Sequence, residues 1–256
     1  MTDFFRFPHI PHVEWLSFGV PRDDKVLSPV EVADLLAGNV VVEEKLDGAN
    51  LGFSVSPDGR IRSQNRGQYL TSPDRGQFAK LGPWLEANED RLFDALGTGL
   101  MAFGEWCAAR HSLDYPTLPD WWLLFDIFDR VEGRFWSTLR RDAWAELHGF
   151  TVVPTLHTGR VRTAQLREWV TSEQSRFRDG NLEGLVIRSE GADWLKMRGK
   201  LVRADFTQAI NIHWRSRALE WNQLSRLNLH KELQLSPGEA KVEKTKTFTR
   251  QIVSHR

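Results

Sequence analysis

Residues 43–50 have the sequence EEKLDGAN, the most informative stretch of the chain. They follow VVV at residues 40–42, a β-branched run that is typical of a buried strand. Lys45 is therefore expected at a strand end, followed by Asp47 and by a glycine that lets the chain turn sharply. A lysine in this pattern is equally compatible with an ordinary surface residue, so its meaning depends on the segments around it.

The sequence on both sides predicts strands that alternate with helices. Alternating residues at 51–56, the turn PDG at 57–59 and the segment 60–63 predict a β-hairpin. Together these patterns favour an α+β fold with largely antiparallel sheets. Further strands are expected at 100–106, 121–128, 184–188 and 193–202, helices at 28–36, 75–96, 138–148 and 163–177, and an amphipathic helix through Ile210, Trp214, Ala218, Trp221 and Leu224.

The composition limits the class of protein. The 256 residues are 41% hydrophobic and 27% charged, which excludes disordered, collagen-like and coiled-coil chains. No apolar run reaches the roughly 18–20 residues of a membrane span, and the first residues lack the apolar region of a signal peptide. The one cysteine, Cys107, excludes an intrachain disulfide and a multi-cysteine zinc site, so a reducing, cytoplasmic location is expected.

The net charge of zero hides a basic carboxyl-terminal part. Residues 200–256 contain eleven Lys and Arg against five Asp and Glu. Such a part indicates a polyanionic partner or, equally well, a solvated helical face. The eleven tryptophans are compatible with core packing and with stacking on bases.

Four further segments combine strands with acidic, aromatic or basic residues. They are FGEW at 103–106, LLFDIF at 123–128, EGLVIR at 183–188 and WLKMRGK at 194–200. With residues 43–50, they resemble the ordered motifs K-x-D/H-G, F/Y-G-E, F-D, E-G-h-V and K/R-x-K of the covalent nucleotidyltransferases. This superfamily comprises ATP-dependent RNA and DNA ligases and mRNA capping enzymes.

The resemblance implies a nucleotidyltransferase (ATP-grasp-like ligase adenylation) fold. It has two largely antiparallel sheets flanked by helices, and is expected at residues 1–204. A short basic helical extension at residues 205–256 is expected to follow, because the roughly 55 residues after the basic strand are too few for an OB-fold barrel.

The resemblance also implies that Lys45 is the nucleophile that attacks the α-phosphorus of ATP and forms a lysyl–AMP intermediate. An ordinary lysine, with a pKa near 10.4, has no lone pair at pH 7. Burial and neighbouring cations must therefore lower its pKa. Lys196, Arg198 and Lys200 are the candidate catalytic cations. Residues i and i+2 share a face of a strand, so the functional pair is either Lys196 and Arg198 or Arg198 and Lys200.

The remaining roles follow from the same resemblance. Glu183 is expected to hold Mg²⁺ or Mn²⁺, which prefer oxygen ligands. Asp47 is expected near the metal or the ribose. Glu105 is expected to bind the ribose hydroxyls, Phe125 to stack on the purine and Glu43 to meet the edge of the adenine. Arg66 is expected to contact phosphates of ATP or of a polynucleotide end. Arg188 and His111 are weaker candidates, and Asp126 and Asp129 are assigned structural roles.

Asn50 indicates which branch of the superfamily the chain resembles. DNA ligases and capping enzymes usually have arginine two residues after the motif glycine, whereas one branch of RNA ligases has asparagine. Asp47 departs from that branch, which often has histidine there. No NAD-reading module is seen, so ATP is the expected donor.

The expected function is an ATP-dependent RNA ligase that joins 3′-hydroxyl and 5′-phosphate ends. The alternatives are a small ATP-dependent DNA ligase or nick-sealing repair enzyme, and a non-catalytic module that binds nucleic-acid ends. The expected partner is RNA, as free ends or in a nicked duplex, with no membrane. Whether a protein partner supplies end specificity stays open.

Overall fold

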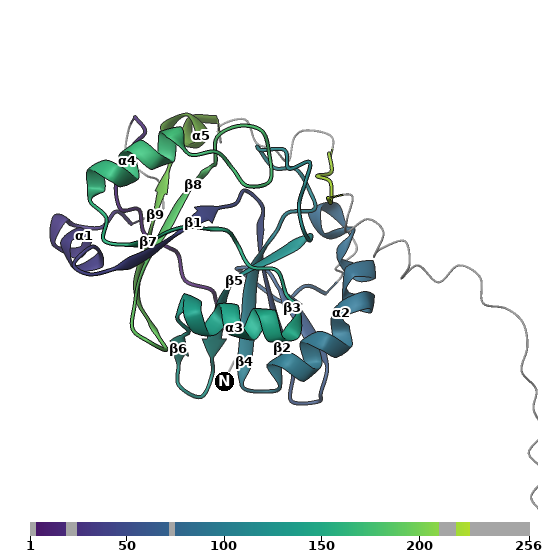
Figure 1. Cartoon of the computed structure of the whole chain (residues 1–256). Coiled ribbons are helices and arrows are strands. Elements are labelled where there is room, and N and C mark those ends of the chain that lie inside the picture. Colours follow the sequence, from purple (N-terminus) through teal and green to yellow (C-terminus); the bar gives the residue numbers. More distant parts are fainter. Residues whose placement is uncertain (1–3, 19–24, 72–74, 210–218, 226–256) are drawn as a thin grey trace, which may run out of the picture.

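The computed structural model describes residues 4–18, 25–71, 75–209 and 219–225, and two antiparallel sheets form its centre (Figure 1). The first sheet has the strand order β7-β1-β8-β9 and the second has β3-β2-β4-β5-β6. The first contains β1 (Val40–Lys45), β7 (Thr155–Gly159), β8 (Gly184–Glu190) and β9 (Leu195–Val202). The second contains β2 (Ala49–Val55), β3 (Ile61–Gln64), β4 (Leu100–Trp106), β5 (Trp122–Asp129) and β6 (Arg134–Phe135).

Two helices cover the outer face of the first sheet, α1 (Pro29–Leu35) and α4 (Thr163–Ser172) (Figure 1). α1 begins where the sequence favours a start, because Ser28 and Glu31 form a capping box and a proline occupies the first turn. The buried side chains are Leu35 of α1, Leu166 and Val170 of α4, and Val40, Val42, Leu185, Ile187 and Leu201 of the sheet. The short helix α5 (Ala204–Ala209) follows β9.

The outer face of the second sheet packs against α2 (Leu81–Leu96) and α3 (Thr138–His148), with the 3₁₀ turn η1 (Gly76–Phe78) before α2. Phe53, Trp84 and Trp122 form an aromatic core between α2 and the strands, with Phe53 and Trp84 stacked at a centroid distance of 5.3 Å. Tryptophans therefore fill this core, which is one of the two uses that composition alone left open.

The inner faces of the two sheets are joined by the amino-terminal segment, residues 4–13. Phe5 and Phe7 pack with Phe103 and Phe128 of the second sheet. At the other end of the segment, Lys200 of β9 donates its backbone N–H to Pro11, at 2.8 Å. The segment thus lies between the sheets and fixes their inner faces relative to each other.

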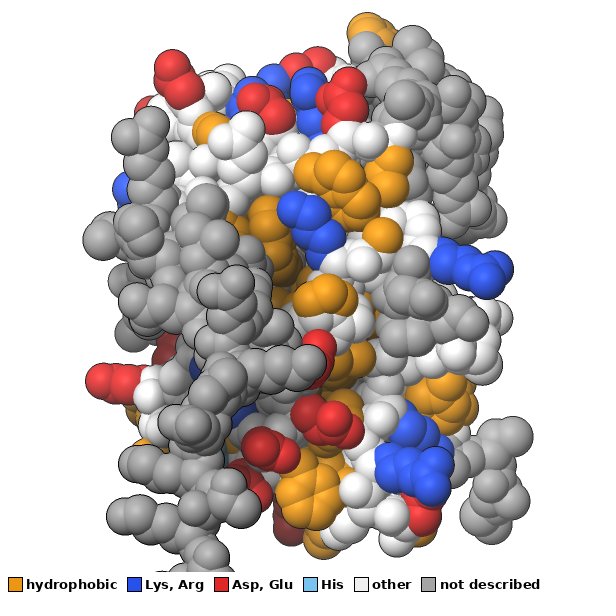
Figure 2. Space-filling model, turned by 90° about the vertical axis from the view of Figure 1, so that its right-hand side faces the viewer, with side chains coloured by type: hydrophobic (Ala, Val, Ile, Leu, Met, Phe, Trp, Pro, Cys, Tyr) orange, Lys and Arg blue, Asp and Glu red, His pale blue; other side chains and the backbone are white. Residues whose placement is uncertain are grey.

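The view of Figure 2 shows the side on which α2 lies in Figure 1. Among the described residues on this side of the molecule, acidic, basic and apolar side chains are intermixed. None of the helices in the described ranges is long and apolar enough to cross a membrane.

The expected α+β fold with two antiparallel sheets is confirmed. The helix expected at 163–177 ends earlier, at Ser172, because Glu173 has an extended backbone. The sequence did not predict the short strands β6 and β7.

The prediction of a helix through Trp221 and Leu224 is wrong for residues 219–225. This stretch instead pairs with residues 107–118, because Asn222 donates its backbone N–H to Ala108 and Gln223 donates to Tyr115. The rest of that expected helix and the polar carboxyl-terminal residues lie outside the described ranges.

Candidate active site

A cavity of about 510 Å³ lies between the two sheets, a volume typical of small-molecule sites. The first sheet and the second sheet both contribute to its wall, and so does the amino-terminal segment. Its lining includes Phe7, Ile10, Glu43, Glu44, Lys45, Asn50, Arg66, Gln77, Glu105, Phe125, Asp126, Val153, Val186, Arg188 and Lys200.

Lys45 is the last residue of β1 and lines this cavity. Its Nζ lies 2.6 Å from Oε1 of Glu183, which precedes β8. The next turn is fixed by Gly48, since a Cβ there would lie 2.5 Å from the backbone oxygen of Trp106. The glycine of the motif therefore lets the turn between β1 and β2 approach the end of β4, where Glu105 lies.

The charges around Lys45 are dominated by carboxylates. Burial lowers the pKa of Lys45, but Glu183, Glu105 and Asp47 outweigh burial and raise the pKa above its ordinary value. Burial raises the pKa of Glu183 to about 8 and that of Glu105 to about 7. In the ligand-free protein Lys45 is therefore an ammonium group, and the site has a strong tendency to take up positive charge.

Glu105 and Asn50 are paired neighbours on β4 and β2. Glu105 accepts a hydrogen bond from the backbone N–H of Gly48, at 3.0 Å. Neither the amide oxygen nor the amide nitrogen of Asn50 has a hydrogen-bond partner among the described residues, and both atoms are buried. The Nε atom of Arg66 is also buried and has no hydrogen-bond partner among the described residues. Unsatisfied polar groups in a cavity wall are expected where a ligand supplies the missing hydrogen bonds.

A β-bulge brings Phe125 and Asp126 to the same cavity. Phe103 pairs with Asp126 and Gly104 pairs with Leu124, so Phe125 is the extra residue of β5. The ring of Phe125 contacts that of Phe7 at a centroid distance of 5.3 Å. Phe125 is thus half-buried beside the aromatic core, with one part facing the cavity.

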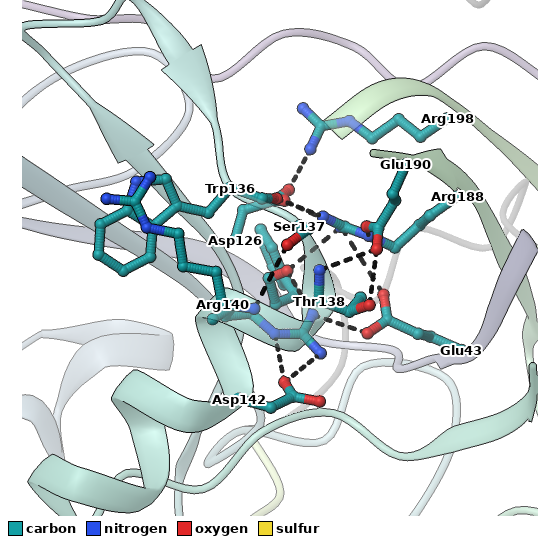
Figure 3. A network of polar contacts seen from close by, with 12 residues as sticks. Glu43, Asp126, Trp136, Ser137, Thr138, Arg140, Asp142, Arg188, Glu190 and Arg198 are labelled. Atoms are coloured by element: carbon teal, nitrogen blue, oxygen red, sulfur yellow. Dashed lines mark hydrogen bonds and ion pairs between the residues drawn. The ribbon is translucent and has the colours of Figure 1, made fainter. Parts of the chain in front are cut away.

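Glu43 lines the cavity, but its carboxylate forms ion pairs with arginines, and its expected contact with the adenine edge stays a prediction. Glu43 is buried, with Oε1 2.7 Å from Nη1 of Arg141 and Oε2 3.7 Å from Nη1 of Arg188. Figure 3 shows that Glu43 belongs to a network in which Arg188 and Arg198 converge on Asp126. This network, whose charged residues are Glu43, Asp126, Arg141, Asp142, Arg188, Glu190 and Arg198, is called the arginine network below.

The structure separates the three basic residues of β9. Lys200 lines the cavity and pairs with Val186 of β8. Arg198 is buried in the arginine network, bonded to Asp126 and covered by the ring of Phe7, at 4.6 Å. Lys196 is exposed near the far end of the hairpin and does not belong to the cavity wall. The geometry thus favours Lys200 over Lys196 as the lysine that can reach a ligand.

Asp47 is not one of the residues that line the cavity. Its Oδ2 accepts hydrogen bonds from the backbone N–H groups of Ser112 and Leu113, both at 2.7 Å. Its own N–H donates to the hydroxyl of Tyr115, at 2.9 Å. His111, in the same loop, contacts Gln77 at 2.9 Å. Asp47 therefore anchors the loop beside the lysine.

Asn222 supports the loop beside the site, although no sequence pattern singles it out. Its side chain donates to the backbone oxygen of Cys107, at 2.7 Å, and accepts from the backbone N–H of Tyr115, at 2.8 Å. It therefore fixes the loop that holds Asp47. No motif marks Asn222, and only the three-dimensional contact could have identified it.

The carboxylates near Lys45 are the oxygen donors available to a divalent metal. Within the described ranges, no group of three or more His, Cys, Asp or Glu side chains could hold a metal by itself. Glu183 nevertheless has one buried oxygen, Oε2, that lacks a partner among the described residues. This fits Mg²⁺ or Mn²⁺, because such ions take few protein carboxylates and complete their shell with phosphates and water.

Comparisons with known proteins agree with this geometry. The family model described as RNA ligase matches residues 38–202. No curated protein that was compared matches the chain.

Similar solved structures include RNA ligase from Naegleria gruberi. A variant of that enzyme with ATP and Mn has 19% identity and a TM-score of 0.58, covering 82% of this chain and 60% of that chain. The enzyme with PPi has 18% identity and a TM-score of 0.55, with coverages of 83% and 65%. An apo variant has 17% identity and a TM-score of 0.51, with coverages of 72% and 53%. At such identities the likeness shows the fold, and this chain spans between about half and two thirds of those chains.

Proposed function

The chain belongs to the RNA ligase family, and we propose that it is an ATP-dependent RNA ligase that joins 3′-hydroxyl and 5′-phosphate ends. The observation that carries this proposal is the position of Lys45. A half-buried amine at the wall of a nucleotide-sized cavity, 2.6 Å from Glu183, is suited to covalent nucleotidyl transfer.

The first step forms a bond between Nζ of Lys45 and the α-phosphorus of ATP. The bond from that phosphorus to the pyrophosphate oxygen breaks, pyrophosphate leaves, and Lys45 loses its proton. Glu183 and Glu105 raise the pKa of Lys45, whereas burial lowers it. Once the two carboxylates are neutralised, the effect of burial dominates and favours the neutral amine.

Glu183 would hold Mg²⁺ or Mn²⁺, which supplies positive charge next to the phosphates when bound. Lys200 and Arg66 add fixed positive charge at the cavity wall and favour the charge that develops on the phosphates, whereas the charge of Arg188 is balanced by Asp126 and Glu190. Phe125 is proposed to stack on the purine and Glu105 to bind the ribose hydroxyls.

The next two steps use the RNA ends. The 5′-phosphate attacks the phosphorus of lysyl–AMP and releases Lys45, and the 3′-hydroxyl then attacks the adenylylated 5′-phosphate and releases AMP. Asn50, whose two amide atoms have no hydrogen-bond partner among the described residues, is a candidate for contact with these ends. We assign these reactions to an adenylation domain at residues 1–204. The basic residues of the extension at 205–256 would hold backbone phosphates, so RNA binding is expected to weaken with salt.

The single cysteine, which is buried and unpaired, fits a cytoplasmic location.

The test is incubation with α-labelled ATP and Mg²⁺ or Mn²⁺, followed by denaturation. Label should stay on the wild-type protein and disappear in Lys45→Ala. Lys25→Ala is the matched control, because Lys25 also forms an ion pair with a glutamate, Glu31, but is exposed. An unlabelled wild type would contradict the proposal and favour a non-catalytic end-binding module.

A panel of substrates then separates the kinds of ligase. Single-stranded RNA ends, nicked RNA duplexes and nicked DNA are offered to the labelled protein at equal concentration. Sealing of RNA ends faster than nicked DNA supports the RNA ligase, and the opposite order supports a DNA ligase.

A further inference from the structure

The amino-terminal segment lies outside the residues matched by the family model, yet it reaches the cavity. Its first anchor is Phe7, which is 1% exposed. The ring of Phe7 packs against Phe103 at 4.9 Å, and the guanidinium of Arg198 lies 4.6 Å from its centre. Phe7 is therefore fixed between the second sheet and the arginine network.

The second anchor is the backbone of residues 11–13, which follow Ile10. Lys200 donates its N–H to the backbone oxygen of Pro11, and Val13 donates its N–H to the backbone oxygen of Lys200, both at 2.8 Å. β9 is the edge strand of the first sheet, so residues 11–13 satisfy hydrogen-bonding groups that β8 does not reach. The segment is held on both sides of Ile10 by contacts that leave it little freedom.

Ile10 lies between these anchors, half-buried, and lines the cavity. The other apolar side chains of the wall are Phe7, Leu46, Ala49, Phe125, Val153 and Val186, whereas the cations of the wall are Lys45, Arg66, Arg188 and Lys200. An aliphatic side chain offers nothing to a triphosphate, but it packs well against the flat apolar face of a purine.

We propose that Ile10 is a specificity-determining residue that forms an apolar wall for the purine base of ATP. This inference rests on the proposed function and adds to it a contact from outside the matched region. The base would lie near Ile10 and Phe125, and the triphosphate would lie toward Lys45, Arg66 and Lys200. The amino-terminal segment is thus a part of the nucleotide site as well as a link between the sheets.

The test compares Ile10→Ala with Ile61→Ala in the ATP-labelling assay. Ile61 is a matched control, because it is also half-buried but packs on the core of the second sheet away from the cavity. Ile10→Ala should raise the apparent KM for ATP about tenfold, from the loss of part of an aliphatic contact. Ile61→Ala should leave the apparent KM within about twofold of wild type, a change too small to indicate a lost contact.

Competition experiments locate the contact on the base. Adenosine should inhibit labelling of Ile10→Ala about tenfold less well than it inhibits wild type, and tripolyphosphate should inhibit both equally. A uniform loss for both competitors would overturn the inference, because it would indicate a general distortion of the site.

Thermal melting checks that each variant is folded. If Ile10→Ala does not fold, Ile10→Val removes one methyl group and should still raise the apparent KM about threefold. If wild type is labelled and the folded variant has the same apparent KM for ATP, the role of Ile10 is contradicted but the proposed function is not. An unlabelled wild type contradicts the proposed function instead.

Discussion

Replacing Arg141 should destabilise the protein strongly, because its charge is the main partner of buried Glu43. Both side chains are almost fully buried, at 0% and 1% exposure, and their atoms lie 2.7 Å apart. In Arg141→Met the nearest remaining cation is Arg188, at 3.7 Å, and Arg188 is already bonded to Asp126 and Glu190. Leaving a buried carboxylate without its partner costs about 3–5 kcal/mol.

Urea denaturation followed by tryptophan fluorescence measures this loss. Arg167→Met is the matched control, since Arg167 contacts Glu14 at the same distance of 2.7 Å but on the surface. Exposed ion pairs contribute about 0–1 kcal/mol, so the control should lose no more than that. A loss below about 1 kcal/mol in Arg141→Met would refute the reasoning, because it would show that Glu43 is not dependent on Arg141.

A double-mutant cycle with Glu43→Gln separates the structural role of Glu43 from contact with the adenine. The effects of Arg141→Met and Glu43→Gln on the free energy of unfolding should be coupled by at least ~2 kcal/mol, as expected for groups in direct contact. The doubly changed protein should keep an apparent KM for ATP within about threefold of wild type, because the Glu43 carboxylate is occupied by arginines. A rise above about tenfold in a stable protein would support the adenine contact that the sequence suggested.

Three further outcomes are expected. Lys200→Ala should lower the rate of labelling by about a hundredfold, the effect of losing one charge-stabilising donor. Lys196 is exposed, so Lys196→Ala should be labelled nearly as fast as wild type. Equal rates in the two variants would contradict the placement of Lys200 at the cavity wall. For Glu105, burial raises the pKa from 4.5 to about 7, so the folded protein binds the extra proton and wild type loses stability as the pH rises from about 4.5 to 7. In urea denaturation at pH 5 and pH 8, Glu105→Gln should therefore gain about 2 kcal/mol relative to wild type at the higher pH, and a parallel pH dependence would count against this. Asn222→Ala should cost about 1–3 kcal/mol of unfolding free energy by leaving backbone groups of Cys107 and Tyr115 unsatisfied, and unchanged denaturation would show that the segment 219–225 does not hold that loop.

The sequence predicted the parts of the fold that depend on local patterns. The β-branched run at 40–42 and the glycine after Asp47 are local signals, and they placed β1 and its turn correctly. The short strands β6 and β7 have no such signal, because long-range pairing creates them. The carboxyl-terminal stretch 219–225 has helical spacing, but backbone bonds to a distant loop outweigh that local preference.

For the site, the residue types could be predicted better than their surroundings. The motif lysine and Glu105 both line the cavity, as the family resemblance implied. Glu183 is not one of the lining residues, but it forms an ion pair with Lys45. The arginine partner of Glu43 comes from α3, which contains none of the five motifs, so only the structure reveals that this carboxylate is occupied. The contribution of Ile10 was equally hidden, because a lone aliphatic residue before the first motif carries no pattern.

The proposed reaction requires that the amine of Lys45 becomes covalently bound to AMP. Mass spectrometry of the intact protein after incubation with ATP and Mg²⁺, followed by peptide mapping, detects this bond. The mass should increase by one AMP, located on the peptide that contains Lys45, and the added mass should disappear when RNA with a 5′-phosphate is added. An unmodified Lys45, or AMP located on another residue, would contradict the proposed reaction.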